Sequence, residues 1–141
     1  MATLQQVEAV VRATYANIWN DWYAGLPSQV PATLLVDGKC NSAGYSFQKN
    51  ELVISLCDGN LNDDDSLNAD GWPCWKTDLV HEMLHEYENK VVKIPTPQGK
   101  SLFAAYPHPW WGKGHEELFY SAVADRASYF TLTPRQLLDN L

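Results

Sequence analysis

The 141-residue sequence predicts an α+β fold in a single domain that spans residues 1–141. Apolar residues recur at helical spacing near the amino terminus and again in the second half of the chain. Three short β-prone runs lie between these two parts. Hydrophobic residues make up 45% of the chain and charged residues 19%, which is enough apolar material for a packed core.

Charge and hydropathy exclude several function classes. Ten Lys and Arg residues against seventeen Asp and Glu residues give a formal net charge of −7, and the basic residues do not cluster, so we expect no autonomous nucleic-acid binding. No run of about 20 apolar residues could cross a membrane, and the first residues lack the pattern of a signal peptide. Cys40, Cys57 and Cys74 are odd in number and form no C-x-x-C pair, so we expect reduced thiols in a cytoplasmic protein. The sequence leaves the oligomeric state open.

The first expected element is an amphipathic helix. Thr3 and Gln6 fit a capping box at its start, and Gly25-Leu26-Pro27 ends it because proline cannot continue a helix. The apolar residues that define its buried stripe are Leu4, Val7, Val11, Ile18 and Trp22.

A small sheet is expected next. Three runs read as strands, at Thr33–Val36, Ala43–Gln48 and Glu51–Leu56. Asp37-Gly38 is a hairpin signal, so we expect the three strands to form an antiparallel meander. The acidic segment Asp58–Gly71 then predicts a solvated loop.

Helices dominate the expected second half of the chain. The expected helices are one that starts between Pro73 and Asp78 and ends near Lys90, one from His115 to about Phe130, and a short one after Thr133-Pro134. The last is indicated by a proline at the first helical position behind a capping threonine. Residues 91–114 are rich in proline and glycine, and we expect them to be irregular.

The sharpest motif is His81-Glu82-Met83-Leu84-His85. Residues four apart lie on one face of a helix, so two imidazoles at this spacing can bind one zinc ion at about 2.0–2.1 Å. Glu82 is rotated by about 100° from His81, which keeps it out of the ligand set but within reach of a water molecule on the metal. The alternative is a pair of histidines that only make hydrogen bonds in the core.

A catalytic zinc ion usually has three protein ligands, so a third must come from elsewhere in the chain. The downstream candidates are His108, His115, Glu116, Glu117 and Asp125. We favour His115, because a side chain at the start of a helix can project toward a metal. Glu116 or Glu117 would instead give a site of two histidines and one glutamate.

With these residues the chain resembles the SprT-like zinc metallopeptidases. The resemblance runs from about Val7 to Arg126 and rests on four phrases: Trp22-Tyr23-Ala24-Gly25-Leu26-Pro27, Ala43-Gly44-Tyr45-Ser46 with Val53-Ile54-Ser55, the motif from His81 to His85, and His115 followed by Phe119. It implies a zincin-like fold with an N-terminal helix, a small antiparallel sheet, an HExxH helix and C-terminal helices. It also implies zinc ligands at His81, His85 and His115, with Glu82 as the catalytic acid and base.

The predicted activity is therefore that of a zinc metalloendopeptidase, in which Glu82 activates a zinc-bound water to hydrolyse a polypeptide. Trp110, Trp111 and Tyr106 are candidate substrate-binding residues, and Tyr87, Tyr106 and Tyr120 are candidate donors to the oxyanion. Two other function classes stay open at this point. One is a zincin-fold binding or regulatory module, and the other is a zinc hydrolase of a non-peptide amide.

Overall fold

A computed structural model describes residues 2–61, 67–68 and 70–141. It divides into two compact units, residues 1–83 and 84–141, and the division falls inside one helix. Each unit is described by itself. Helices and a three-stranded sheet together make the fold class α+β, as predicted. Within the described ranges, no helix combines the length and apolar character that crossing a bilayer requires.

Helix α1 (Leu4–Trp22) opens the first unit as the sequence predicts. Its capping box is formed, because Gln6 N donates to Thr3 Oγ1 at 3.2 Å and Thr3 N donates to Gln6 Oε1 at 2.8 Å. Leu4, which was expected on the buried stripe, is 41% exposed. The buried side chains of the helix are Val7, Val11, Tyr15, Ile18 and Trp22.

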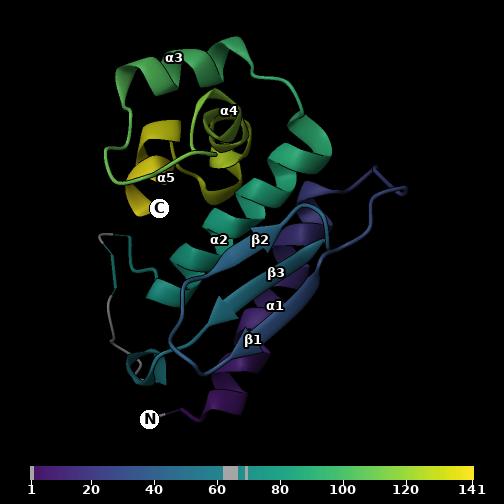
Figure 1. Cartoon of the computed structure of the whole chain (residues 1–141), viewed down its shortest axis with the longest axis vertical. Helices are drawn as coiled ribbons and strands as arrows, with labels where there is room; N and C mark the ends of the chain where they lie inside the picture. Colours follow the sequence, from purple (N-terminus) through teal and green to yellow (C-terminus); the bar gives the residue numbers. More distant parts are fainter. Residues whose placement is uncertain (1, 62–66, 69) are drawn as a thin grey trace. The chain divides into compact units, whose positions relative to one another are not determined.

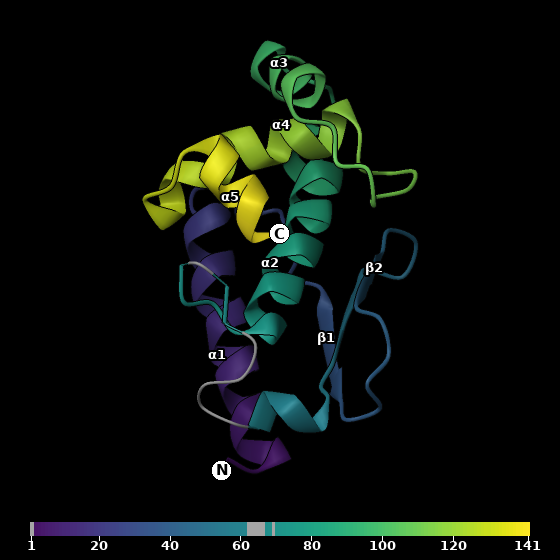
Figure 2. The ribbon, with the colours of Figure 1, turned by 90° about the vertical axis from the view of Figure 1, so that its left-hand side faces the viewer.

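The sheet contains β1 (Thr33–Asp37), β2 (Gly44–Ser46) and β3 (Glu51–Ser55) in the order β1-β3-β2 (Figure 1). Strand β3 pairs antiparallel with β2 but parallel with β1. The predictions of an all-antiparallel meander and of a hairpin at Asp37-Gly38 are therefore wrong. Figure 2 shows the sheet edge-on, with α1 and the first turns of α2 on one side of it.

The connection after β1 explains the parallel pairing. Instead of turning back, the chain stays bonded to the end of β3: Leu56 N donates to Asp37 O at 2.8 Å, and Cys40 N donates to Leu56 O at 3.2 Å. Cys40 and Cys57 form a disulfide with a Cα–Cα distance of 4.5 Å. The expectation that all three cysteines are reduced thiols is thus wrong. Cys74 is exposed and lies outside this disulfide.

Helix α2 (Cys74–Tyr87) carries the HExxH motif, and its start lies within the predicted range. It continues directly into a π-helical turn, η2 (Glu88–Val92), which ends at Lys93 with a φ of 61°. The helix has an apolar flank in which Leu79, Val80, Met83 and Leu84 are fully buried.

The second unit contains α3 (Pro97–Ala105), α4 (Glu117–Arg126), a 3₁₀ turn η3 (Ala127–Phe130) and α5 (Pro134–Asn140). Figure 1 shows α3 lying along α4. The capping box of Thr133 and Gln136 at α5 is formed as predicted.

Helix α3 contradicts the expectation that residues 91–114 are irregular. Thr96 caps it by accepting a hydrogen bond from Gly99 N at 3.1 Å, and Pro97 occupies its first position. The helix packs closely on α4, since a Cβ at Gly99 would lie 1.9 Å from Ser121 Oγ. Tertiary packing therefore supports a short helix inside a proline-rich segment.

Candidate metal centre

The three histidines singled out by the sequence form a cluster. His81 and His85 lie one turn apart on α2, and His115 lies just before α4. One nitrogen of each ring lies within 4.8 Å of the corresponding nitrogens of the other two. All three side chains are half-buried. This set of donors fits a metal ion such as zinc, although it is not specific for zinc.

Hydrogen bonds fix how two of these imidazoles face each other. His85 Nδ1 lies 3.1 Å from Glu88 Oε1, and His115 Nδ1 lies 3.2 Å from Gly112 O. Carboxylate and carbonyl oxygens only accept hydrogen bonds, so each Nδ1 is assigned the proton and each Nε2 a lone pair. The two Nε2 atoms are 3.1 Å apart. Two lone pairs at this distance repel each other unless a proton or a metal ion lies between them.

Electrostatics also favour the form of His115 that binds metal. Burial lowers the pKa of His115 below its usual value, and the nearby His85 and His108 lower it further, against the raising effect of its bond to Gly112 O. A lowered pKa keeps the imidazole neutral at neutral pH, and only a neutral imidazole can donate a lone pair to a metal.

Aromatic rings hold the imidazoles in place. The Phe119 ring is fully buried, with its centroid 4.5 Å from that of His85 and 5.2 Å from that of His115. Trp111 packs against His115 at 5.1 Å and against Phe119 at 5.4 Å. Phe119 therefore packs against an imidazole of the HExxH helix. These contacts restrict the rotation of both rings before any metal binds.

The sequence predicts a helix that begins at His115. This prediction is wrong, because His115 precedes the first turn of α4. Helix α4 begins at Glu117, and Glu116 is its extended N-cap with φ −110° and ψ −151°. Gly114 has a φ of 89°, a conformation that suits glycine, so the chain turns sharply before the helix. The third histidine is thus presented by a loop.

The other candidates for the third ligand lie outside the histidine cluster found among the described residues. Glu116 is exposed, and Glu117 begins α4. His108 stacks on Trp111 with ring centroids 4.2 Å apart. Asp125 accepts a hydrogen bond from the Tyr87 hydroxyl at 2.5 Å, which makes it a structural partner of that tyrosine.

The candidate substrate-binding residues differ in their surroundings. Trp110 is 87% exposed, whereas Trp111 is half-buried beside His115. Tyr106 is exposed, with the Arg135 guanidinium 3.8 Å from its ring centroid. Trp111 is therefore the candidate whose ring packs against a histidine of the cluster.

Two of the three candidate oxyanion donors are already engaged. The Tyr120 hydroxyl donates to Tyr106 O at 2.8 Å, and the Tyr87 hydroxyl donates to Asp125. Burial raises the pKa of both phenols, and for Tyr87 the bond to Asp125 raises it further. Both hydroxyls have a partner within the fold, so they are poorly placed to serve a substrate.

Sequence reasoning missed Glu88, which contacts His85 from the start of the π-helical turn. The signal was its position three residues after His85, since residues three apart are neighbours on a helix surface.

Glu82 lies on α2 between the two motif histidines and is half-buried.

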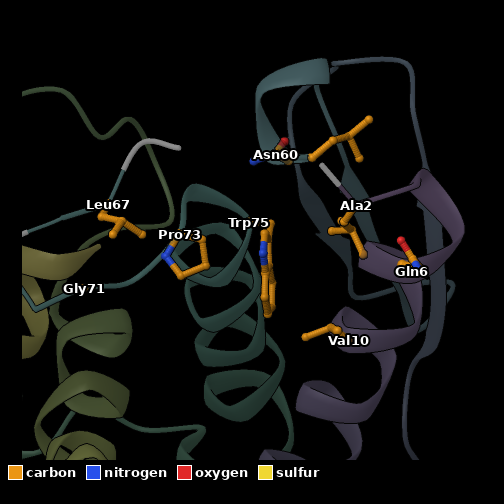
Figure 3. Close-up of a pocket in the computed structure, with 10 residues that line it drawn as sticks. Ala2, Gln6, Val10, Asn60, Leu67, Gly71, Pro73 and Trp75 are labelled. Carbon is orange, nitrogen blue, oxygen red and sulfur yellow. The ribbon is translucent and has the colours of Figure 1, made fainter. Parts of the chain in front are cut away.

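A separate cavity of about 460 Å³ lies in the first unit (Figure 3). Its labelled side chains come from α1, from the start of α2 and from the segments before each helix, and they include Val10, Pro73 and Trp75. None of the candidate catalytic, metal-binding or substrate-binding residues lines it.

In comparisons with known proteins, no family model, no curated protein and no solved structure matched the chain. The resemblance to the SprT-like family stays a prediction.

Proposed function

We propose that the protein is a zinc-dependent metallopeptidase of the HExxH class. The observation that carries this proposal is the cluster of His81, His85 and His115, which places a third imidazole beside a helix that already carries the motif glutamate. Part of the proposal is a zincin-like arrangement, with an N-terminal helix, a small sheet, the HExxH helix and C-terminal helices following in that order.

The residues of the cluster suit the proposed metal. His81, His85 and His115 would hold it, and three protein ligands are the usual set for a catalytic zinc ion. When bound, zinc supplies Lewis-acid polarisation of a carbonyl and lowers the pKa of a nearby water molecule.

Glu82 is proposed to be the catalytic acid and base. On an α-helix it is rotated by about 100° from His81, so its carboxylate serves the attacking water and not the metal. It accepts a proton from that water and delivers it to the amine that leaves when the peptide bond breaks. A module that only bound metal or a partner would have no need of a carboxylate at this position.

A polypeptide is the proposed substrate. Trp111 packs against His115, and the adjacent Trp110 is largely exposed, so an apolar side chain of the substrate can contact an indole close to the reacting bond. The net charge of −7 supports a protein substrate over a nucleic acid, because few counterions would be released from a phosphate backbone.

The proposed compartment depends on whether the cysteines are reduced or form a disulfide. The expectation of a cytoplasmic protein rested on reduced cysteines, and the Cys40–Cys57 disulfide removes that support. Disulfides persist mainly in oxidising environments, so we propose an oxidising compartment as the alternative to the cytoplasm.

The experiment is a hydrolysis assay on casein, short peptides and cell-wall fragments, with and without a metal chelator. We expect chelator-sensitive cleavage of casein or peptides, and no turnover by Glu82→Gln, whose amide cannot accept the proton. This variant should keep its fold and its metal, which circular dichroism and elemental analysis check.

Near-wild-type cleavage by Glu82→Gln would remove Glu82 from the mechanism. Cleavage of only cell-wall fragments would indicate a different amide, and zinc binding without any turnover would indicate a binding module.

A further inference from the structure

We propose that Glu88 is a positioning residue for the metal centre. Its carboxylate fixes the tautomer and the orientation of His85, so that Nε2 of that imidazole faces the metal. This inference rests on the proposed metal centre, but it concerns a residue outside the HExxH motif and outside the ligand cluster.

The contact between the two side chains is buried. Glu88 is 4% exposed, and its Oε1 lies 3.1 Å from His85 Nδ1. Its second oxygen, Oε2, is buried without a hydrogen-bond partner in the described part of the chain. Burial of a charged carboxylate costs free energy unless the carboxylate is well paired. The incomplete pairing of Glu88 therefore points to a role other than stability.

Glu86 provides the contrast within the same segment. It is also buried, at 0% exposure, but Lys90 Nζ lies 2.5 Å from its Oε2. An ammonium group therefore compensates the charge of Glu86, whereas Glu88 pairs with an imidazole. A metal on the other side of that imidazole would supply the positive charge that Glu88 lacks.

The local backbone supports the same role. Helix α2 gives way to a π-helical turn at Glu88 itself, and such turns inside helices are frequent at functional sites. The turn follows directly after the last α-helical residue, Tyr87, so the change of backbone occurs where the carboxylate meets His85.

The consequence for the imidazole is specific. An acceptor for the Nδ1 proton leaves the lone pair of the neutral ring on Nε2, and a carboxylate in that position also makes the ring a stronger ligand. For His115, Gly112 O lies 3.2 Å from Nδ1 and so also leaves the lone pair on Nε2. The acceptor at His85 Nδ1 is a carboxylate, whereas the acceptor at His115 Nδ1 is a neutral carbonyl.

The test compares zinc affinity with the stability of the metal-free protein, using zinc alone and a competing chromophoric chelator. Glu88→Leu and Glu88→Gln should weaken zinc binding by roughly 10- to 100-fold, as loss of such partners does elsewhere. The metal-free Glu88→Leu protein should unfold at the wild-type temperature or above it, because the variant removes an incompletely partnered buried charge. Glu86→Gln is the matched control, and we expect its zinc affinity to stay within about twofold of wild type, since Glu86 pairs with Lys90.

A second readout follows the tautomer directly. In ¹⁵N NMR spectra of the metal-free protein, wild-type His85 should carry its proton on Nδ1, and Glu88→Leu should shift the population toward the Nε2–H form. Unchanged zinc affinity in both Glu88 variants, with a wild-type tautomer, would overturn the proposal while the metal centre stood. A variant that lost stability but not zinc affinity would do the same, because it would assign Glu88 a structural role. Absence of zinc binding by the wild-type protein would overturn the metal centre itself, and this inference with it.

Discussion

The two units differ in what they bury. Among the described residues, the buried polar or charged side chains are Ser55, Glu86, Glu88, Ser121 and Asn140, and only the first of these belongs to residues 1–83. The first unit has an apolar core around Leu52 and Ile54 and a disulfide at the end of its sheet. The second unit buries two carboxylates in one segment, one of them against an imidazole of the histidine cluster.

The difference agrees with the proposed role of Glu88 beside the metal centre. Apolar burial and a disulfide both favour the folded state of the first unit. A buried carboxylate with one oxygen unpartnered among the described residues, as in Glu88, does not by itself favour the folded state of the second unit. Sites with such local conflicts are typical of functional centres, where a ligand resolves them.

Close helix packing in the second unit gives the largest expected effect. Gly99→Ala places a Cβ 1.9 Å from Ser121 Oγ and 2.5 Å from Ser121 Cα. Because backbone atoms cannot rotate away, we expect a loss of about 3 kcal/mol or more in the free energy of unfolding. Gly44→Ala in β2 is the matched control, since a Cβ there meets nothing within 4 Å. Equal urea midpoints for the two variants would contradict this packing of α3 on α4.

The helix that contains Gly99 also shows how far the sequence could predict the fold. Thr96-Pro97 and Thr133-Pro134 both place a capping threonine before a proline at the first helical position. The sequence analysis nevertheless predicts a helix only after Thr133-Pro134. The surrounding prolines and glycines favour a loop locally, and the packing of Gly99 on Ser121 overrides that preference. Long-range contact of this kind leaves no periodic pattern in the sequence.

The sheet and the metal centre show the same limit. The start of α2 and the spacing of His81 and His85 are local, so the sequence could predict them. The parallel pairing of β1 with β3 depends on a connection that crosses the end of β3, and strand-forming residues alone do not specify direction. The sequence favours His115 as a residue at the start of a helix, but it could not predict the loop that brings this residue to His85 from 30 positions away.

Loss of the disulfide should weaken the first unit. The bond closes a separation of 17 residues, for which chain-entropy arguments give about 3 kcal/mol. The double variant Cys40→Ser with Cys57→Ser should lower the urea midpoint and reduce hydrogen-exchange protection in β3. Cys74→Ser should do neither, and thiol labelling without reductant should modify Cys74 alone. Labelling of all three cysteines in the folded protein would restore the reduced-thiol expectation.

Zinc should act most strongly on the second unit, which contains His85 and His115, two of the three proposed ligands. At a free concentration about 100 times its dissociation constant, a ligand that binds only the folded state contributes about 2.7 kcal/mol. We therefore expect zinc to raise hydrogen-exchange protection in η2 and α4 more than in α1 or β3. Equal gains in all four elements would show that the metal does not distinguish the two units.

Acid sensitivity of the first unit is the smallest expected effect. Ser55 Oγ donates to Asp37 Oδ1 at 2.5 Å, and Lys39 N donates to the same oxygen at 3.0 Å, which lowers the pKa of Asp37 below its usual value. The ionised carboxylate of Asp37 therefore stabilises the folded state. This stabilisation is fully present above the unfolded pKa of 3.8 and is lost as pH falls through the lower pKa of the folded state. Asp37→Asn should thus be slightly less stable than wild type at pH 7, with the difference shrinking toward pH 2. A difference that grew on acidification would contradict the assigned hydrogen bonds.

Zinc titration of the metal-free protein tests the central claim most directly, namely that His81, His85 and His115 form one metal centre. We expect the wild-type chain to bind one zinc ion, and His81→Ala, His85→Ala and His115→Ala each to lose tight binding. Glu116→Ala and Glu117→Ala should bind as the wild type does, because neither glutamate belongs to the cluster. Tight binding by His115→Ala, together with loss in one of the glutamate variants, would contradict the claim and convert the site to two histidines and one glutamate.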